Sequence, residues 1–361
     1  MSKYWSKLVT QLEPYIPGEQ PQDQQYIKLN TNENPYPPSP KVLTAIKAAV
    51  NDSLKLYPDP NSVDLKQAIA KYYNVAIEEV FVANGSDEVL AVAFQAFFKN
   101  QSPSSNPLLF PDISYSFYDA YCKLYEIEPG RIPLEKNLSI NLNKYSQKNG
   151  GVIFPNPNAP TGKALPLSEI ESYLNKNDKT VVIVDEAYVD FGADSVIPLI
   201  SKYPNLLSIQ TFSKSRSLAG SRIGFAVGNK DLIEALERVK NSYNSYTLDK
   251  LALVAGTEAI KDTEYFQQTV STIIQTREST SKRLTALGFN LIPSSTNFVF
   301  AQHNSINAET LYLELKSQGI LVRYFKRDRI DNYLRITIGT QNEMNTFLQR
   351  LDDIIKNLSQ D

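Results

Sequence analysis

Short runs of apolar and β-branched residues alternate with stretches of helical periodicity through the middle of the chain. The runs predict strands, and apolar residues spaced three and four apart predict helices. This alternation is typical of an α/β domain with a largely parallel sheet flanked by helices. The predicted strands lie at 80–83, 108–110, 151–154, 180–184, 206–210 and 223–227, and the predicted helices at 87–98, 167–174 and 231–239.

The two ends of the chain have different patterns. A long helical stretch at about 263–287 ends at Gly288, and the residues after it predict a small α+β domain. The first 38 residues show little periodicity and predict an irregular arm, after which Ser39 and Ser62 are candidate helix caps. The C-terminal strands are expected at 297–301, 320–322 and 333–338, with helices at 308–316 and from about 341. We expect an arm at 1–38 belonging to the small domain, a large domain at 39–284 and a small C-terminal domain at 285–361.

Charge and composition narrow the class of partner. The 37 Lys and Arg nearly balance the 39 Asp and Glu, and no basic run is long enough to indicate a nucleic-acid or anionic-membrane surface. A single cysteine, Cys122, forms no intramolecular disulfide, and no cysteine or histidine cluster suggests a metal. No stretch reaches the about 18 apolar residues of a membrane span. We expect a cytoplasmic, soluble protein whose partners are small molecules or another subunit.

Several polar motifs follow predicted strands, where ligands of an open parallel sheet bind. After the first strand comes Asn-Gly-Ser-Asp-Glu at 84–88, in which the amides of Ser86 and Asp87 open a helix that can receive a phosphate. An ordinary helix cap is the alternative. After the second strand, Tyr115 can stack on a cofactor ring or simply pack in the core. The third strand enters a proline-rich loop at 155–162 that presents its polar groups rigidly.

The fourth predicted strand ends in Asp-Glu-Ala-Tyr at 185–188. A buried carboxylate such as Asp185 can keep a pyridinium nitrogen protonated, so that the ring withdraws electrons from a carbanion. Tyr188 can donate a hydrogen bond to the phenolate oxygen of the same ring. The alternative is a capping acid followed by a core tyrosine.

The fifth predicted strand leads into Thr-Phe-Ser-Lys at 211–214, with an arginine eight residues after the lysine. The Lys214 amine can condense with a phosphorylated aldehyde as a Schiff base, while Thr211, Ser213 and Arg222 hold the phosphate. Taken alone, this stretch could also be a solvated loop. Because five such features follow consecutive strands, together they predict one site for pyridoxal 5'-phosphate.

On these motifs the chain resembles the fold-type I aminotransferases, with a large mostly parallel α/β domain and a small α+β domain. Within them it most resembles the histidinol-phosphate aminotransferase family of histidine biosynthesis. The early Asn-Glu-Asn-Pro and the late Leu-Arg-Ile-Thr stretches suggest that subfamily. The matching stretches are 29–35, 57–60, 84–88, 155–162, 185–188, 211–224 and 333–340.

The resemblance implies a role for each matching residue. Lys214 would carry the cofactor, Asp185 would face its ring nitrogen, Tyr188 its ring oxygen, and Tyr115 would stack on the ring. The implied phosphate ligands are Ser86, Asp87, Thr211, Ser213, Arg222 and Tyr57, the last reaching in from a second subunit of a homodimer. The implied substrate ligands are Tyr15, Asn32, Arg323 and Arg335.

One position departs from the family pattern. Relatives carry asparagine before Pro-Thr-Gly, where it binds the ring oxygen, but this chain has Ala159. Either Asn158 replaces that contact or Tyr188 bears it alone.

The expected reaction is a ping-pong transamination in which histidinol phosphate is the amino donor and 2-oxoglutarate the acceptor. The products are imidazole-acetol phosphate and glutamate. An aromatic aminotransferase or a phosphothreonine decarboxylase would use nearly the same cofactor residues. A non-catalytic regulator that binds the cofactor is the alternative from another class, although no basic helix-turn-helix pattern accompanies the motifs.

Overall fold

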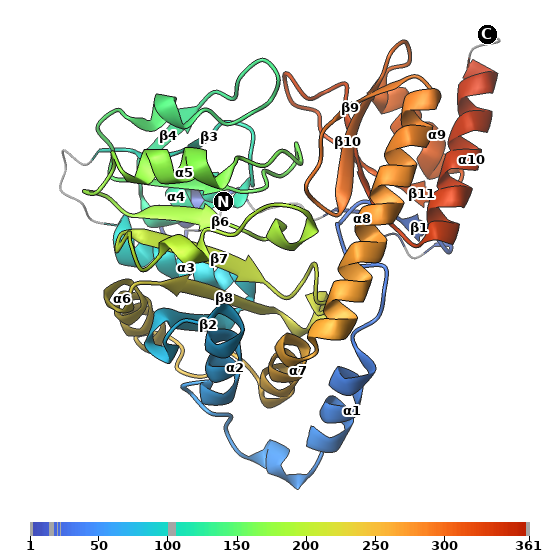
Figure 1. Ribbon diagram of the computed structural model, residues 1–361. Coiled ribbons are helices and arrows are strands. Elements are labelled where there is room, and N and C mark those ends of the chain that lie inside the picture. Colours follow the sequence, from blue (N-terminus) through green and yellow to red (C-terminus); the bar gives the residue numbers. More distant parts are fainter. Residues whose placement is uncertain (1–2, 14–17, 20, 22, 100–105, 359–361) are drawn as a thin grey trace.

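A seven-stranded sheet forms the centre of the large domain (Figure 1). The computed structural model describes residues 3–13, 18–19, 21, 23–99 and 106–358. The strand order is β2-β8-β7-β6-β5-β3-β4, and all neighbours are parallel except those of β8, which runs antiparallel to β2 and β7. The start of β8 therefore lies at the edge where β2 and β7 end. The strands are β2 (Val80–Asn84), β3 (Leu108–Pro111), β4 (Pro129–Ile132), β5 (Gly151–Pro155), β6 (Val182–Asp185), β7 (Leu206–Thr211) and β8 (Ile223–Gly228).

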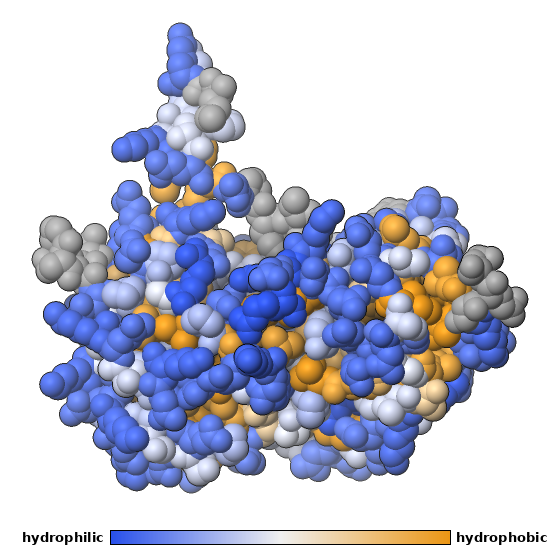
Figure 2. All heavy atoms as spheres, turned by 90° about the horizontal axis from the view of Figure 1, so that it is seen from above, coloured by the Kyte–Doolittle hydropathy of each residue, from blue (hydrophilic) through white to orange (hydrophobic). Residues whose placement is uncertain are grey.

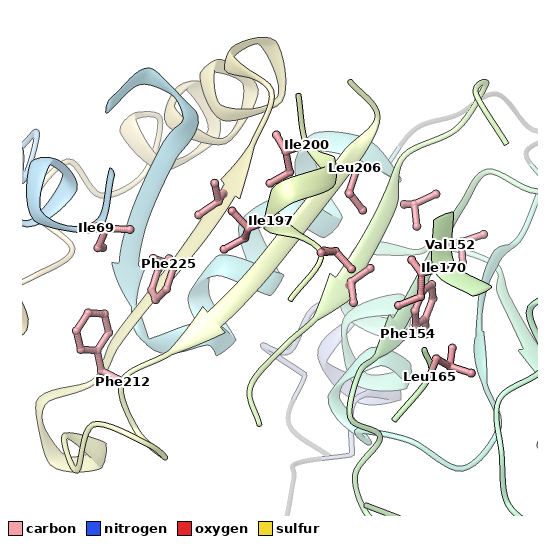
Figure 3. Close-up of a cluster of buried hydrophobic side chains, with 14 of the residues drawn as sticks. Ile69, Val152, Phe154, Leu165, Ile170, Ile197, Ile200, Leu206, Phe212 and Phe225 are labelled. Carbon is pink, nitrogen blue, oxygen red and sulfur yellow. The ribbon is translucent and has the colours of Figure 1, made fainter. Parts of the chain in front are cut away.

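Helices cover both faces of this sheet because its strands are apolar on both sides. Along β6, Val182 and Val184 belong to one buried cluster and Ile183 to the other. Figure 3 shows the first cluster, with strand residues such as Phe154 and Phe225 beside Ile69 and Ile170 from helices. That face packs against α1 (Pro40–Ala49), α2 (Val63–Tyr73), α5 (Leu167–Leu174) and α7 (Lys250–Lys261), and the other against α3 (Gly85–Phe97), α4 (Phe117–Tyr125) and α6 (Lys230–Asn241).

The small domain is built on a four-stranded antiparallel sheet of order β12-β13-β10-β9. Its core joins this sheet to three helices, and α8 runs along its side toward the large domain (Figure 1). The N-terminal arm is tied to it, because β1 (Ile27–Lys28) pairs in parallel with β11 (Ile320–Leu321). The elements are β9 (Phe289–Ile292), β10 (Phe298–His303), β12 (Arg323–Tyr324), β13 (Leu334–Thr337), α8 (Thr263–Ala286), α9 (Ala308–Ser317) and α10 (Gln341–Leu358).

Short 3₁₀ turns connect the larger elements. One of them, η5, directly follows the Asp-Glu-Ala-Tyr motif, and another, η7, precedes β8 and Arg222. In the described part of the chain these turns are η1 (Val9–Gln11), η2 (Asp52–Lys55), η3 (Ile77–Glu79), η4 (Leu142–Tyr145), η5 (Val189–Phe191), η6 (Ile197–Leu199) and η7 (Ala219–Ser221).

The fold class predicted from the sequence is confirmed, and so are the six strands predicted in the large domain, with ends displaced by one or two residues. The helices and strands that were not predicted are β1, α4, β4, α7, β9 and β12. Ser39 does cap α1, accepting from the amide of Lys41, and Ser62 of the predicted Asn61-Ser62 pair occupies the N-cap position of α2, although its side chain makes no capping hydrogen bond. The Asp59 carboxylate takes that role, because it accepts from the amides of Asn61 and Val63 at 2.9 and 2.8 Å. The exact domain boundaries stay a prediction.

The face of the molecule seen in Figure 2 is mostly covered by hydrophilic side chains, with smaller apolar groups between them. Among the described residues, no helix has the length and apolar character that crossing a membrane requires.

Candidate active site

A cavity of about 290 Å³ lies at the carboxyl ends of the parallel strands of the large domain, where they face the small domain and the arm. Its wall brings together residues that are far apart in the sequence. Of the residues predicted for the site, it contains Asn32, Ser86, Asp87, Tyr115, Asp185, Tyr188, Thr211, Ser213, Lys214, Arg222, Arg323 and Arg335. Asn158 and Tyr57 are not on this wall, and Tyr15 lies outside the described residues.

One end of the cavity is suited to a phosphate. Here α3 begins at Gly85, and the amides of its first turn have no partner within the helix. A β-carbon on Gly85, whose φ is +80°, would lie 2.7 Å from the Arg222 guanidinium, and one on Gly224 would lie 2.2 Å from the Ser86 amide. Only glycine therefore lets the helix start and the arginine approach each other so closely.

The Arg222 guanidinium is held in place by two side chains. It donates to the Ser213 hydroxyl at 3.3 Å and forms an ion pair with Asp87 at 3.0 Å. The Tyr115 hydroxyl donates to the other oxygen of Asp87 at 2.6 Å. Guanidinium, hydroxyl and amide donors thus converge at this end, which is the donor set that a phosphate needs.

Asp185 is the last residue of β6 and is 5% exposed. Burial raises the pKa of its carboxyl group to about 6, although hydrogen bonds donated by the Tyr118 hydroxyl at 2.8 Å and the Ala187 amide at 3.2 Å oppose that shift. No ion-pair partner for Asp185 exists among the described residues. A buried carboxylate without a cation fits a ligand that brings a positive charge, such as a protonated pyridine nitrogen.

Tyr118 was missed by the sequence reasoning. It lies on the unpredicted helix α4, three residues after Tyr115, which precedes that helix, and the two rings meet edge to face with centres 5.9 Å apart. Since the chain has 21 tyrosines, only that spacing pointed to it.

Lys214 and Tyr188 lie together at the middle of the cavity. The Lys214 amine is 5.8 Å from the centre of the Tyr188 ring and donates to the Thr31 carbonyl at 3.2 Å. The Tyr188 hydroxyl accepts a hydrogen bond from the Asn32 side chain at 2.9 Å. The Asn34 side chain donates to the Lys214 carbonyl at 3.0 Å, so the arm fixes the lysine backbone as well. Thr31 and Asn34 were part of the matching stretch 29–35, but the sequence predicted no role for either residue.

The proline-rich loop puts Ala159, and not Asn158, on the cavity wall. Asn158 is 1% exposed, and its amide donates to the Ile113 carbonyl and the Thr161 hydroxyl, both at 3.1 Å. Both of its N–H groups are therefore used, one within the loop and one to the segment that follows β3. Asn158 thus does not lie on the cavity wall of this structure, and its predicted contact with a cofactor stays a prediction.

Two arginines close the small-domain side. Arg323 on β12 and Arg335 on β13 are cross-strand neighbours. The Arg335 guanidinium lies over the rings of Phe298 and Phe325, 5.4 and 5.5 Å from their centres, and donates to the Asn30 carbonyl at 2.9 Å. Two forked cations on one wall are suited to anionic substrate groups.

Tyr57 lies outside the cavity of its own chain. Its side chain is 82% exposed, and its ring stacks on Tyr246 with centres 4.7 Å apart. Leu54 and Leu56 beside it are also exposed. An exposed aromatic and aliphatic group of this kind is typical of a contact surface.

Residues 24–351 match the model of the aminotransferase class I and II family. The chain is 57% identical to histidinol-phosphate aminotransferase 1 of Hydrogenovibrio crunogenus over 99% of both chains. It is 55% identical to histidinol-phosphate aminotransferase of Clostridium acetobutylicum, over 98% of this chain and 100% of the relative. The solved structure of the Sinorhizobium meliloti histidinol-phosphate aminotransferase in complex with pyridoxal-5'-phosphate has the same fold, with a TM-score of 0.89, 22% identity and 99% coverage of both chains.

Proposed function

Because the chain belongs to the aminotransferase class I and II family, we propose that it transfers the amino group of histidinol phosphate to 2-oxoglutarate. The products are imidazole-acetol phosphate and glutamate. The observation that carries the proposal is the single cavity in which Lys214, Asp185 and the two arginines meet. The relatives named for this reaction, which match the whole chain at 52–57% identity, support the choice of substrate.

The cofactor is pyridoxal 5'-phosphate, and the parts of the cavity match its parts. Lys214 would attach it covalently, the buried Asp185 would face its ring nitrogen and Tyr188 its ring oxygen. Its phosphate would lie against the start of α3 beside Thr211, Ser213 and Arg222. When bound, the cofactor supplies an electron-withdrawing ring that stabilises negative charge on the substrate carbon.

The protein itself moves the proton. Among the described residues of the cavity wall, Lys214 has the only amine, and when it is not joined to the cofactor this amine would take the proton from the amine-bearing carbon of the substrate and pass it to the former aldehyde carbon of the cofactor. The Thr31 carbonyl, which accepts from this amine at 3.2 Å, holds it beside Tyr188. Asp185 would stay ionised opposite the protonated ring nitrogen of the cofactor, because that positive charge offsets the cost of burying the carboxylate.

Substrate recognition belongs to the small domain. Histidinol phosphate has a phosphate where glutamate has its α-carboxylate, so one wall must bind both anions. The forked guanidinium groups of Arg323 and Arg335 suit both, since each can form two parallel hydrogen bonds to either anion.

The substrate is tested by mixing the purified, cofactor-loaded protein with single amino donors and following the loss of its visible absorption. We expect histidinol phosphate to react at least ~10-fold faster, per concentration, than phenylalanine or histidinol without phosphate, since a charge-assisted hydrogen bond is worth about 1.5–3 kcal/mol. Phenylalanine as the best donor would indicate an aromatic aminotransferase. Release of carbon dioxide from phosphothreonine would indicate the decarboxylase.

We further propose that the protein acts as a homodimer in which Tyr57 reaches the phosphate of the partner's cofactor. The exposed group of Leu54, Leu56 and Tyr57, with its stacked Tyr246, supports this proposal. In sedimentation we expect a dimer, and Tyr57→Phe should weaken cofactor binding by roughly 2- to 10-fold, the value of one hydrogen bond. A monomeric wild-type protein, or a Tyr57→Phe variant that binds the cofactor as tightly as the wild type, would refute this proposal. The cytoplasmic location likewise stays a prediction.

A further inference from the structure

A chain of hydrogen bonds joins the small-domain sheet to Tyr188. Thr337 on β13 accepts from the Asn32 backbone amide at 3.0 Å, and its hydroxyl donates to the Asn32 side-chain oxygen at 2.9 Å. The Asn32 side-chain nitrogen then donates to the Tyr188 hydroxyl at 2.9 Å. Thr337 and Asn32 are 3% and 1% exposed, so water does not compete for the two bonds between them, whereas the bond to the half-buried Tyr188 lies at the cavity wall.

The backbone of Asn32 is adapted to this position. Its φ is +57°, a left-handed conformation that asparagine tolerates better than most residues. The Asn297 side chain donates to the Asn32 carbonyl at 3.0 Å, and Asn297 is fully buried. Thr337 thus holds the backbone amide of Asn32 and Asn297 its carbonyl, so the side-chain amide of Asn32 starts from a fixed backbone position.

The direction of the bonds decides what Tyr188 can do. With its oxygen toward Thr337, the Asn32 amide gives the buried threonine proton an acceptor. Turning the amide around would remove that acceptor and would use the Tyr188 proton instead. Because Tyr188 accepts from Asn32, its own O–H is left to donate to a ligand in the cavity.

This donor matters more here than in a site with two donors to the ring oxygen. Ala159 has no hydrogen-bonding side chain, and the Asn158 amide already donates to the Ile113 carbonyl and the Thr161 hydroxyl. Tyr188 is then the side chain placed to donate there. A hydroxyl that already accepts a hydrogen bond is polarised and donates more strongly.

We propose that Asn32 and Thr337 are positioning residues that aim and strengthen the Tyr188 hydroxyl, in place of the second donor that Ala159 cannot supply. This inference rests on the proposed function, since it concerns the bound cofactor. The bond to the ring oxygen spreads its negative charge, and the lysine-linked nitrogen beside it then holds its proton less tightly. Because Thr337 lies two residues from Arg335 on β13, the relay also connects the substrate wall to the cofactor.

The test is a pH titration of the visible absorption of the cofactor-loaded protein, which reports the proton on the lysine-linked nitrogen without any turnover. Asn32→Ala and Thr337→Val should raise its midpoint by about 0.5–1 pH unit, the scale of one lost hydrogen bond. Thr337→Ser keeps the hydroxyl and should keep the wild-type midpoint. Ala159→Asn, which adds a donor, should lower the midpoint. The charged groups on this wall are the same in every variant, namely Asp87, Asp185, Lys214, Arg222, Arg323 and Arg335.

A double-mutant cycle separates this relay from a general structural effect. In the Tyr188→Phe background, Asn32→Ala should cause no further shift, because its effect passes through the tyrosine hydroxyl. An unchanged midpoint in Asn32→Ala, or a shift that simply adds to that of Tyr188→Phe, would overturn the proposal. If Asn32→Ala fails to fold, the Thr337→Val and Thr337→Ser pair decides. A wild-type protein with no lysine-bound cofactor would instead refute the proposed function.

Discussion

The two halves of the cavity are built in opposite ways. The cofactor half comes from one sheet, where Asp185 ends a strand and Ser86 and Lys214 each follow one. The substrate half comes from the arm and the small domain, where Asn32 meets Thr337, 305 residues further along the chain. The first half is thus fixed by local order along the chain, and the second only by tertiary contacts.

This difference separates two kinds of effect. Changes in the cofactor half should alter the chemistry with every substrate, because all substrates react on the same ring. Changes in the substrate half should act mainly through KM and should depend on the anion that the substrate carries.

The largest expected effect is that of Lys214→Ala, which removes both the covalent anchor and the base. We expect turnover to fall by at least ~10⁴-fold with every donor, and the lysine-bound visible absorption to disappear. Stopped-flow absorption with excess cofactor measures both. Retained lysine-type absorption in this variant would show that another amine is the anchor.

Asp185→Asn should lower kcat by roughly 10²- to 10³-fold with both histidinol phosphate and glutamate, since a neutral amide cannot keep the ring nitrogen protonated. Glu186→Gln is the matched control, because it also replaces a buried carboxylate by a neutral amide of the same shape. Glu186 is also fully buried, but its carboxylate faces Ser208, Gln210 and Ser195 away from the cavity. An equal fall in kcat in both variants would mean that any buried carboxylate near the end of β6 matters for turnover, and not its position on the cavity wall.

Arg335→Lys should raise KM by about 10-fold for both anionic substrates and change kcat less, because lysine keeps the charge but loses the fork. Steady-state kinetics with histidinol phosphate and 2-oxoglutarate test this. A loss confined to one substrate would mean that the two anions bind to different groups, which would sharpen the account of the substrate half.

The smallest expected effect concerns stability. Burial raises the pKa of Asp185 to about 6 from its ordinary 3.8, so in the cofactor-free protein protonation stabilises the fold below 3.8, and this stabilisation is lost as the pH rises through about 6. Asp185→Asn should therefore raise the thermal unfolding midpoint of the cofactor-free protein at pH 8 by roughly 2–4 °C. The gain should shrink toward pH 4 in calorimetry. A gain independent of pH would contradict a charge effect.

The same contrast explains how far sequence reasoning reaches. The residues of the cofactor half were predictable because strand ends meet at one edge of a parallel sheet. The Asn32 relay and the role of Tyr118 were not, since each depends on a partner from another element. The Asn158 side chain points away from the cavity because it donates to the Ile113 carbonyl, from the segment after β3, and to Thr161, and no local pattern predicts the first of these contacts.

Covalent trapping shows directly whether Lys214 carries the cofactor opposite Asp185. The cofactor-loaded protein is reduced with borohydride, digested and analysed by peptide mass spectrometry. We expect the reduced cofactor on the peptide that contains Lys214, with the Asp185→Asn protein still labelled at the same residue. Labelling of a different lysine, or none, would contradict the account.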